Sequence, residues 1–247
     1  MIIDLNCDMG EGIGNDEAIM PFITSVNIAC GYHAGNKEIM IKTIRLALHY
    51  NVSIGAHPSF FDRENFGRIE KNLSDSEIFD LILKQLKLLD DLAGNYGTKL
   101  HHVKPHGALY NLSANNSSVA KAIASAVKNF DPHLILFGLS GSQSIHQAKK
   151  INLKTASEVF ADRTYREDGS LTPRSQAGAM IENAEEAVKQ ALQMIQSKTV
   201  NTISGKKIPI DAETICIHGD GKHAVQFAQL IHEALKKEGI KLQSNQV

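Results

Sequence analysis

The run Ile2-Ile3-Asp4-Leu5-Asn6-Cys7-Asp8-Met9-Gly10-Glu11-Gly12 introduces a pattern that the rest of the chain repeats. It begins with apolar residues typical of a β-strand and ends in a polar, glycine-rich turn. Side chains alternate along a strand, so Asp4, Asn6 and Asp8 share one face. Carboxylates that point into a barrel need a partner, a cation or a proton, because an unpaired buried charge is costly. The run therefore indicates Asp8 and Glu11 as candidate catalytic residues at the end of a strand.

Six further segments show the same apolar run followed by a polar turn, with helical spacing between them. The seven predicted strands are Ile2–Cys7, Val26–Cys30, Val52–Ala56, Leu100–Lys104, Leu134–Phe137, Ala156–Phe160 and Thr214–His218. Several are apolar throughout, which is typical of strands buried on both faces of a parallel sheet. The sequence thus predicts an α/β protein with a closed or nearly closed (β/α) barrel rather than an open sheet.

The segments between the strands carry helix and turn signals. Ser74 and Glu77 form a capping box ahead of an apolar stripe that begins at Ile78. The segment 200–210, with Ser204-Gly205 in its middle, predicts a hairpin inserted before the last strand. Because no linker or low-complexity stretch interrupts the pattern, we expect a single domain over residues 1–247.

Composition excludes several classes of protein. The formal net charge is −1, so no basic field favours nucleic acid or a membrane surface. No apolar run approaches the roughly 20 residues of a transmembrane helix, and the N-terminus lacks the pattern of a signal peptide. The three cysteines Cys7, Cys30 and Cys216 lie in apolar runs and are odd in number. We therefore expect buried free thiols and a cytoplasmic protein.

Histidine follows four of the predicted strands or closes them. His33 lies between two glycines, His57 and His106 follow the third and fourth strands, and His218 ends the seventh strand just before Asp220. The carboxyl ends of parallel strands meet at one edge, so these groups are expected to share one cleft with Asp8. Such a cleft could bind a metal ion, transfer protons or hold phosphate.

Other polar residues near these strand ends suggest anion binding. Gly35 precedes a helix whose free N–H groups could face an anion, and Arg163 or Arg174 could hold a carboxylate or phosphate. Lys104 is placed before Pro105, which restricts its backbone and suits it to phosphate. The alternative for Lys104 is an ion pair with Asp8 or Asp220.

Six runs, taken together, resemble the LamB/YcsF family. They are DLNCDMGEG (4–12), NIACGYHAG (27–35), GAHPS (55–59), VKPHGALYN (103–111), EVFADRTYREDGSLTPR (158–174) and ICIHGD (215–220). The resemblance implies a distorted seven-stranded (β/α) barrel similar to the glycoside hydrolase/deacetylase superfamily. It also implies the A subunit of an ATP-dependent 5-oxoprolinase, which opens 5-oxo-L-proline to L-glutamate together with subunits B and C.

This hypothesis gives each candidate residue a role and requires ATP with Mg²⁺. The catalytic candidates are Asp8, Glu11, His57, His106 and Lys104, and the substrate-binding candidates are Asn6, His33, Gly35, Arg163, Arg174 and Asp220. One alternative is an amidase or deacetylase that acts without ATP and uses a divalent metal held by Asp8, His33 and His57. Another is a substrate-binding subunit whose chemistry lies in its partners.

Overall fold

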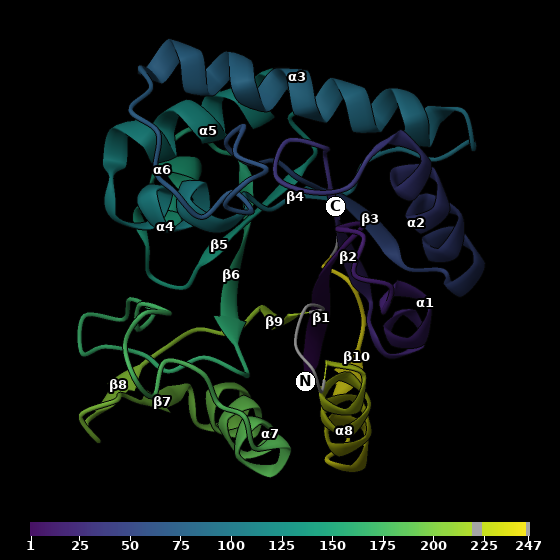
Figure 1. The fold of residues 1–247 in the computed structure, drawn as a ribbon. Coiled ribbons are helices and arrows are strands. Elements are labelled where there is room, and N and C mark those ends of the chain that lie inside the picture. Colours follow the sequence, from purple (N-terminus) through teal and green to yellow (C-terminus); the bar gives the residue numbers. More distant parts are fainter. Residues whose placement is uncertain (219–223, 246–247) are drawn as a thin grey trace.

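The computed structural model describes residues 1–218 and 224–245, and seven parallel strands form its closed central barrel (Figure 1). They are β1 (Ile2–Met9), β2 (Ser25–Ala29), β3 (Ser53–His57), β4 (His102–Val103), β5 (Ile135–Leu139), β6 (Lys154–Phe160) and β9 (Thr214–His218). Each pairs with the next in this order, and β9 pairs with β1 to close the ring. The predicted (β/α) barrel of seven strands is therefore confirmed. A further short strand, β10 (Lys241–Leu242), pairs with the start of β1.

Helices surround the barrel in the order expected for crossover connections (Figure 1). They are α1 (Asp16–Ile19), the 3₁₀ turn η1 (Met20–Phe22), α2 (Lys37–Tyr50), α3 (Asp75–Gly94), α4 (Gly107–Asn115), α5 (Ser117–Phe130), α6 (Gln143–Lys150), α7 (Ala184–Leu192), the π-helical turn η2 (Gln193–Ser197) and α8 (Ala224–Lys237). Between η2 and β9, the strands β7 (Thr199–Asn201) and β8 (Lys207–Pro209) pair antiparallel. This hairpin lies where the sequence predicted an insertion.

The long helix α3 shows why the sequence folds this way locally. The Ser74 hydroxyl accepts from the Glu77 backbone N–H, and the Glu77 carboxylate accepts from the Ser74 N–H, so the predicted capping box is present. The stripe Ile78, Ile82 and Leu86 is buried, which contributes about 1.5–3 kcal/mol for each side chain.

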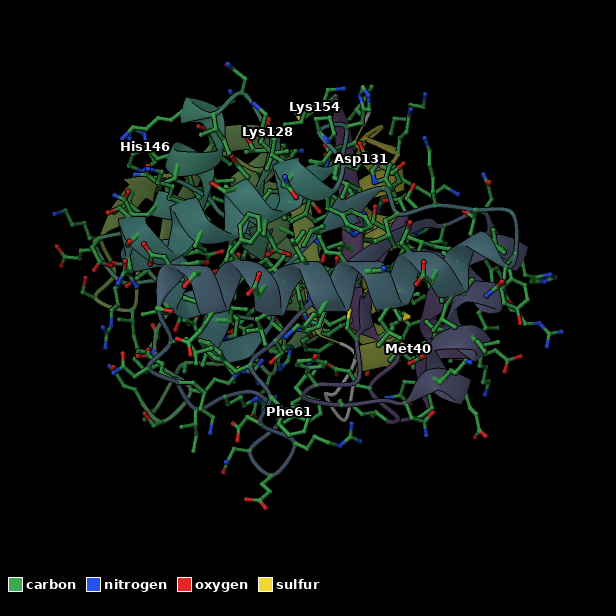
Figure 2. All side chains as sticks on the ribbon, turned by 90° about the horizontal axis from the view of Figure 1, so that it is seen from above. Met40, Phe61, Lys128, Asp131, His146 and Lys154 are labelled. Atoms are coloured by element: carbon green, nitrogen blue, oxygen red, sulfur yellow. The ribbon has the colours of Figure 1, made fainter. Side chains whose placement is uncertain are left out.

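The side chains of interest gather at only one of the two ends of the barrel. In Figure 2, Lys154 at the start of β6 and Phe61 on the loop after β3 lie at opposite sides of the molecule. Phe61 therefore marks the side of the loops that follow the carboxyl ends of the barrel strands, where the side chains of interest gather. Among the described helices, none combines the length and apolar character needed to cross a lipid bilayer.

Candidate active site

A cavity of about 370 Å³ lies at the carboxyl ends of the barrel strands, where parallel barrels carry their active sites. Asp8 from β1, His57 from β3, and Lys104 and His106 just after β4 all line it. The loop after β6 adds Arg163. Acid–base groups and cations from distant parts of the chain therefore face one cavity.

Asp4 lies deepest of the three polar residues on the inner face of β1. Its carboxylate accepts hydrogen bonds from the hydroxyls of Thr24 at 2.6 Å, Ser25 at 2.7 Å and Thr214 at 2.5 Å. Burial raises the pKa of Asp4 to about 6, although these hydroxyls act in the opposite direction. Because Asp4 is fully buried among protein groups, its role is structural.

Asn6 occupies the next inward position and has its amide atoms engaged by the protein. Its amide nitrogen donates to Glu158 at 3.0 Å and to Thr214 at 2.7 Å, and its oxygen accepts from Asn27 at 2.8 Å. The side chain is fully buried and does not line the cavity. Asn6 was expected to bind substrate, and in the structure its amide nitrogen contacts Glu158 beneath the site.

Lys104 lies between two buried carboxylates. Its Nζ is 2.9 Å from Asp8 Oδ1, 2.8 Å from Glu158 Oε1 and 3.0 Å from the Cys216 sulfur. Burial alone would lower the pKa of Lys104, but the neighbouring negative groups, Asp8 first among them, hold it well above its ordinary value. Burial raises the pKa of the Cys216 thiol, so the sulfur is a neutral acceptor and the carboxylates keep the lysine charged. This geometry favours the ion-pair alternative for Lys104 over phosphate binding.

His57 and His106 lie side by side next to Asp8, with one ring nitrogen of each facing the other. His57 Nε2 is 2.8 Å from His106 Nδ1 and 3.4 Å from Asp8 Oδ2. The other nitrogens are held by the backbone, His57 Nδ1 by the Lys104 carbonyl at 2.7 Å and His106 Nε2 by the Phe66 carbonyl at 2.9 Å. Both rings are therefore fixed in orientation, as proton transfer or metal binding requires.

His33 stacks on the far side of His106. The two rings are nearly parallel, with 3.8 Å between their centroids, and His33 Nε2 is 3.4 Å from Glu11 Oε1. Burial, and then the neighbouring His57, lower the pKa of His33 to about 2. His33 is therefore a neutral ring that packs behind His106 and does not line the cavity itself.

Gly35 is required by a close approach of two backbone segments. Its φ is +72°, and a Cβ placed there would lie 2.3 Å from the carbonyl oxygen of Gly10. The N–H of Ile39 near the start of α2 is taken by the Asn36 side chain at 2.9 Å. Gly35 was expected to bind substrate; it is not among the residues that line the cavity, and its turn packs against the β1 loop at Gly10.

The loop after β6 supplies the arginine side chains that line one part of the cavity. Arg163 is buried and donates to the backbone carbonyls of Thr172 at 2.5 Å and Ala179 at 3.3 Å, whereas Arg174 is exposed. Both line the cavity together with Arg166, which the sequence analysis did not single out. Arginine is suited to carboxylate and phosphate groups.

The structure brings together Asp8, His33, His57 and His106, as the strand-end pattern predicted, and Asp220 lies outside the described residues. The predicted metal set of Asp8, His33 and His57 differs from the group that the structure assembles. Donor atoms of Glu11, His33, His57 and His106 lie within 4.8 Å of one another, and these residues could hold a metal ion.

Glu158 is the main functional neighbour that sequence reasoning missed. It is fully buried at the centre of β6 and contacts both Asn6 and Lys104. The available signal was a carboxylate inside a predicted strand of the barrel, since a buried carboxylate needs a partner. Its partners lie far away in sequence and follow only from the closed barrel.

A parallel β/α barrel with histidines and carboxylates around a cavity at its carboxyl end defines a barrel enzyme or a close relative of one. A model of the LamB/YcsF family matches residues 3–247, so the chain belongs to that family, as its motifs indicated.

Relatives and solved structures agree with this membership. The proteins named as the A subunit of 5-oxoprolinase from Bacillus cereus (strain AH187) and Bacillus thuringiensis subsp. konkukian (strain 97-27) are each 48% identical over 246 residues, covering 97% of both chains. The lactam utilization protein from Thermus thermophilus is 39% identical, with a TM-score of 0.93 over 99% of this chain and 100% of that one. A family 4 carbohydrate esterase from Streptomyces lividans shares only the fold, at 10% identity and a TM-score of 0.52, over 98% of this chain and 91% of that one.

Proposed function

We propose that this chain is the A subunit of an ATP-dependent 5-oxoprolinase. The reaction opens the cyclic amide of 5-oxo-L-proline to L-glutamate, while ATP is hydrolysed to ADP and phosphate. The observation that carries the proposal is a single cavity that combines the acid–base groups Asp8, His57 and His106 with Arg163 and Arg174. Family membership and the names of the relatives support it.

The chemistry explains why such a cavity suits this substrate. A five-membered lactam is a poor electrophile, and transfer of a phosphoryl group to its oxygen would turn that oxygen into a leaving group. In the overall reaction, one water is consumed in breaking the C–N bond, its oxygen joining the carbonyl carbon and a proton reaching the nitrogen. A second water is consumed by ATP hydrolysis. The site must therefore accept and deliver protons and hold anionic oxygens.

The proposed roles follow position. Asp8 and the His57–His106 pair transfer protons. Asp8 and the ring pair have Glu11 beside them, and His33 packs behind His106. Arg163 and Arg174 hold the substrate carboxylate or the phosphates of MgATP, in bidentate contacts that arginine favours. In this proposal Lys104 positions Asp8, and Gly35 positions the β1 loop.

The proposal includes partners and a location. The word subunit in the names of the relatives supports an assembly, which we propose to consist of subunits A, B and C acting in the cytoplasm. Two other functions make different predictions. A metal-dependent amidase would open its substrate without ATP, and a substrate-binding subunit would tolerate loss of its own acid–base groups.

The test is glutamate release from 5-oxo-L-proline by the chain alone and with its partner subunits, with and without MgATP. We expect release only from the full assembly with ATP. His106→Gln should lower kcat about 10²- to 10⁴-fold, the usual contribution of a general acid–base group. The matched control is His146→Gln, because His146 lies exposed on α6 (Figure 2) and should leave turnover unchanged. ATP-independent release, or full activity of His106→Gln, would contradict the proposal.

A further inference from the structure

Four side chains that commonly bind metals converge at the mouth of the barrel. Glu11, His33, His57 and His106 come from four separate segments, and their donor atoms lie within 4.8 Å of one another. The three histidines are buried, and Glu11 and Asp8 are close to them. The tautomers of the rings decide what this arrangement can hold.

Hydrogen bonds to the backbone fix the proton on one nitrogen of each of two rings. His57 Nδ1 lies 2.7 Å from the carbonyl oxygen of Lys104, and a carbonyl only accepts, so this nitrogen carries the hydrogen. His106 Nε2 lies 2.9 Å from the carbonyl oxygen of Phe66 and carries its hydrogen for the same reason. In the neutral rings, His57 Nε2 and His106 Nδ1 are both left with lone pairs.

These two lone pairs face each other. His57 Nε2 and His106 Nδ1 are 2.8 Å apart, and two acceptors at that distance repel unless they share a cation. The carboxylate of Asp8 is 3.4 Å from the first nitrogen, and that of Glu11 is 3.6 Å from the second. Two lone pairs and two carboxylates therefore converge on the same small region, which favours a positive charge there.

We propose that His57 Nε2, His106 Nδ1 and a carboxylate oxygen of Glu11 bind a divalent transition metal ion of the zinc or cobalt type. Ligands about 2.1 Å from such an ion, separated by 90–109°, lie roughly 3.0–3.4 Å apart. The distance from His57 Nε2 to His106 Nδ1 is 2.8 Å, just below this range. The distance from His106 Nδ1 to Glu11 Oε1 is 3.6 Å, just above it. Two imidazoles favour zinc or cobalt over magnesium, which prefers oxygen ligands.

The backbone contacts of the rings fit this role. Histidines that bind metals usually donate their other ring N–H to a carbonyl or carboxylate, which fixes the tautomer and aims the lone pair. His57 and His106 both do so, through Lys104 and Phe66. Their ring planes are 82° apart, so one ion can lie in both planes.

His33 is excluded from the ligand set by its orientation. Its ring is within 5° of parallel to His106, with 3.8 Å between the centroids, and an imidazole lone pair lies in the plane of its ring. An ion in the plane of His106 is therefore well out of the plane of His33. His33 instead packs against His106, with Nε2 3.4 Å from Glu11 Oε1.

The three ligands all line the cavity, so the remaining coordination positions would be completed from the cavity side. When bound, the metal would supply a Lewis acid for a carbonyl or phosphoryl oxygen. Because the inner nitrogens of both rings would then be occupied, proton transfer in the metal-bound state would fall to Asp8, and the proton-transfer role proposed above for the ring pair would apply to the metal-free state. The proposed site needs only this chain and does not depend on the 5-oxoprolinase reaction.

The test is metal binding by the full-length chain after treatment with a chelator. Zn²⁺ binding is measured by titration calorimetry, and Co²⁺ binding by its visible absorption. We expect one equivalent to bind. His57→Gln, His106→Gln and Glu11→Gln should each weaken binding at least about 100-fold, whereas His33→Phe should weaken it less than about tenfold, as a neighbour outside the ligand set would.

Two controls keep the outcome decisive. His146→Gln on α6 should bind like the wild type, and circular dichroism checks that each variant is folded. Glu11→Gln nearly preserves shape, so it decides the matter if a histidine variant does not fold. Absence of saturable binding to the wild type would mean that a proton bridges the two rings, and would overturn the proposal. Equal loss in His33→Phe and His106→Gln would overturn the ligand assignment. Neither result would bear on glutamate release, which is measured separately.

Discussion

Replacing Lys104 with methionine removes a buried ammonium group while keeping most of the side-chain volume. Lys104 Nζ lies 2.9 Å from Asp8 Oδ1 and 2.8 Å from Glu158 Oε1, and the lysine side chain is 3% exposed. After the substitution, two carboxylates would remain inside the barrel without the cation that they share. We therefore expect Lys104→Met to destabilise the fold strongly.

The magnitude follows from burial. Removing one partner of a buried ion pair costs about 3–5 kcal/mol, because the other charge is left unpaired. For a chain of this size, a loss of 1 kcal/mol lowers the melting temperature by about 2–4 °C, so we expect a decrease of about 6–20 °C. The exposed pair Lys206–Glu167 is the matched control, with a distance of 3.1 Å and side chains 63% and 53% exposed. Lys206→Met should cost less than about 1 kcal/mol.

Urea unfolding followed by circular dichroism measures both variants, since the chain has no tryptophan for fluorescence. The double variant Lys104→Met/Glu158→Gln removes one of the two stranded charges. It should be more stable than Lys104→Met by about 1–3 kcal/mol, which is the coupling expected of residues in one network. If Lys104→Met costs no more than Lys206→Met, the reasoning about the buried cluster is wrong.

The same variant separates the two roles considered for Lys104. The ammonium group already contacts Asp8, Glu158 and the Cys216 sulfur, so a bound phosphate would have to displace one of them. We therefore expect Lys104→Met to lower the free energy of unfolding by more than it raises the activation free energy of turnover, measured per folded molecule of the assembled enzyme. A phosphate ligand would instead lower kcat and kcat/KM together, by about 2–4 kcal/mol in transition-state stabilisation.

Two further substitutions test the supports of the site. Gly35→Ala should cost at least about 2 kcal/mol more than Gly141→Ala, because both positions have φ near +70° but only Gly35 would place a Cβ 2.3 Å from the Gly10 oxygen. Equal decreases in the free energy of unfolding of the two variants, measured by urea unfolding, would contradict this. Asp4→Asn should become more stable relative to the wild type as pH rises from about 4 to 7. The raised pKa of Asp4, about 6 in the fold against 3.8, means that its protonated form stabilises the fold at low pH and that this stabilisation is lost as pH rises through 6. The expected change is up to about 3 kcal/mol, and an unchanged difference across this pH range would contradict it.

The barrel could be predicted from the sequence because its strands are short apolar runs followed by polar turns. Thr214–His218 is a strand with the predicted bounds. The first strand was predicted to span Ile2–Cys7 and is two residues longer, ending at Met9. The two-residue strand β10 was not predicted, since Lys241–Leu242 carries no strand pattern and pairs only because β1 lies beside it. Tertiary contact, rather than local propensity, decides such an element.

The candidate site was predictable in its location and less so in its contacts. Alternation along β1 correctly put Asp4, Asn6 and Asp8 on an inward face, and all three are buried. It could not give their depth inside the barrel. Asn6 was expected to bind substrate, and the structure places its side chain against Lys104 and Glu158. A pairing such as Asn6 with Glu158 joins residues from opposite parts of the chain, and one sequence contains no measure of that distance.

The depth of these residues is consistent with the metal site that we propose at the mouth of the barrel. Asp4, at the base, accepts hydrogen bonds from three hydroxyls and has a pKa that burial raises to about 6, and Asp8 and Glu158 share the ammonium group of Lys104 one layer higher. Above that layer, Glu11 faces imidazoles whose pKa values burial holds low, so the rings themselves supply no compensating charge. Each carboxylate below has a hydroxyl cluster or a cation beside it, and the layer at the cavity brings Glu11 next to ring nitrogens of His33 and His106. Because Glu11, His57 and His106 line the cavity, a metal ion at the proposed site would enter from the cavity side.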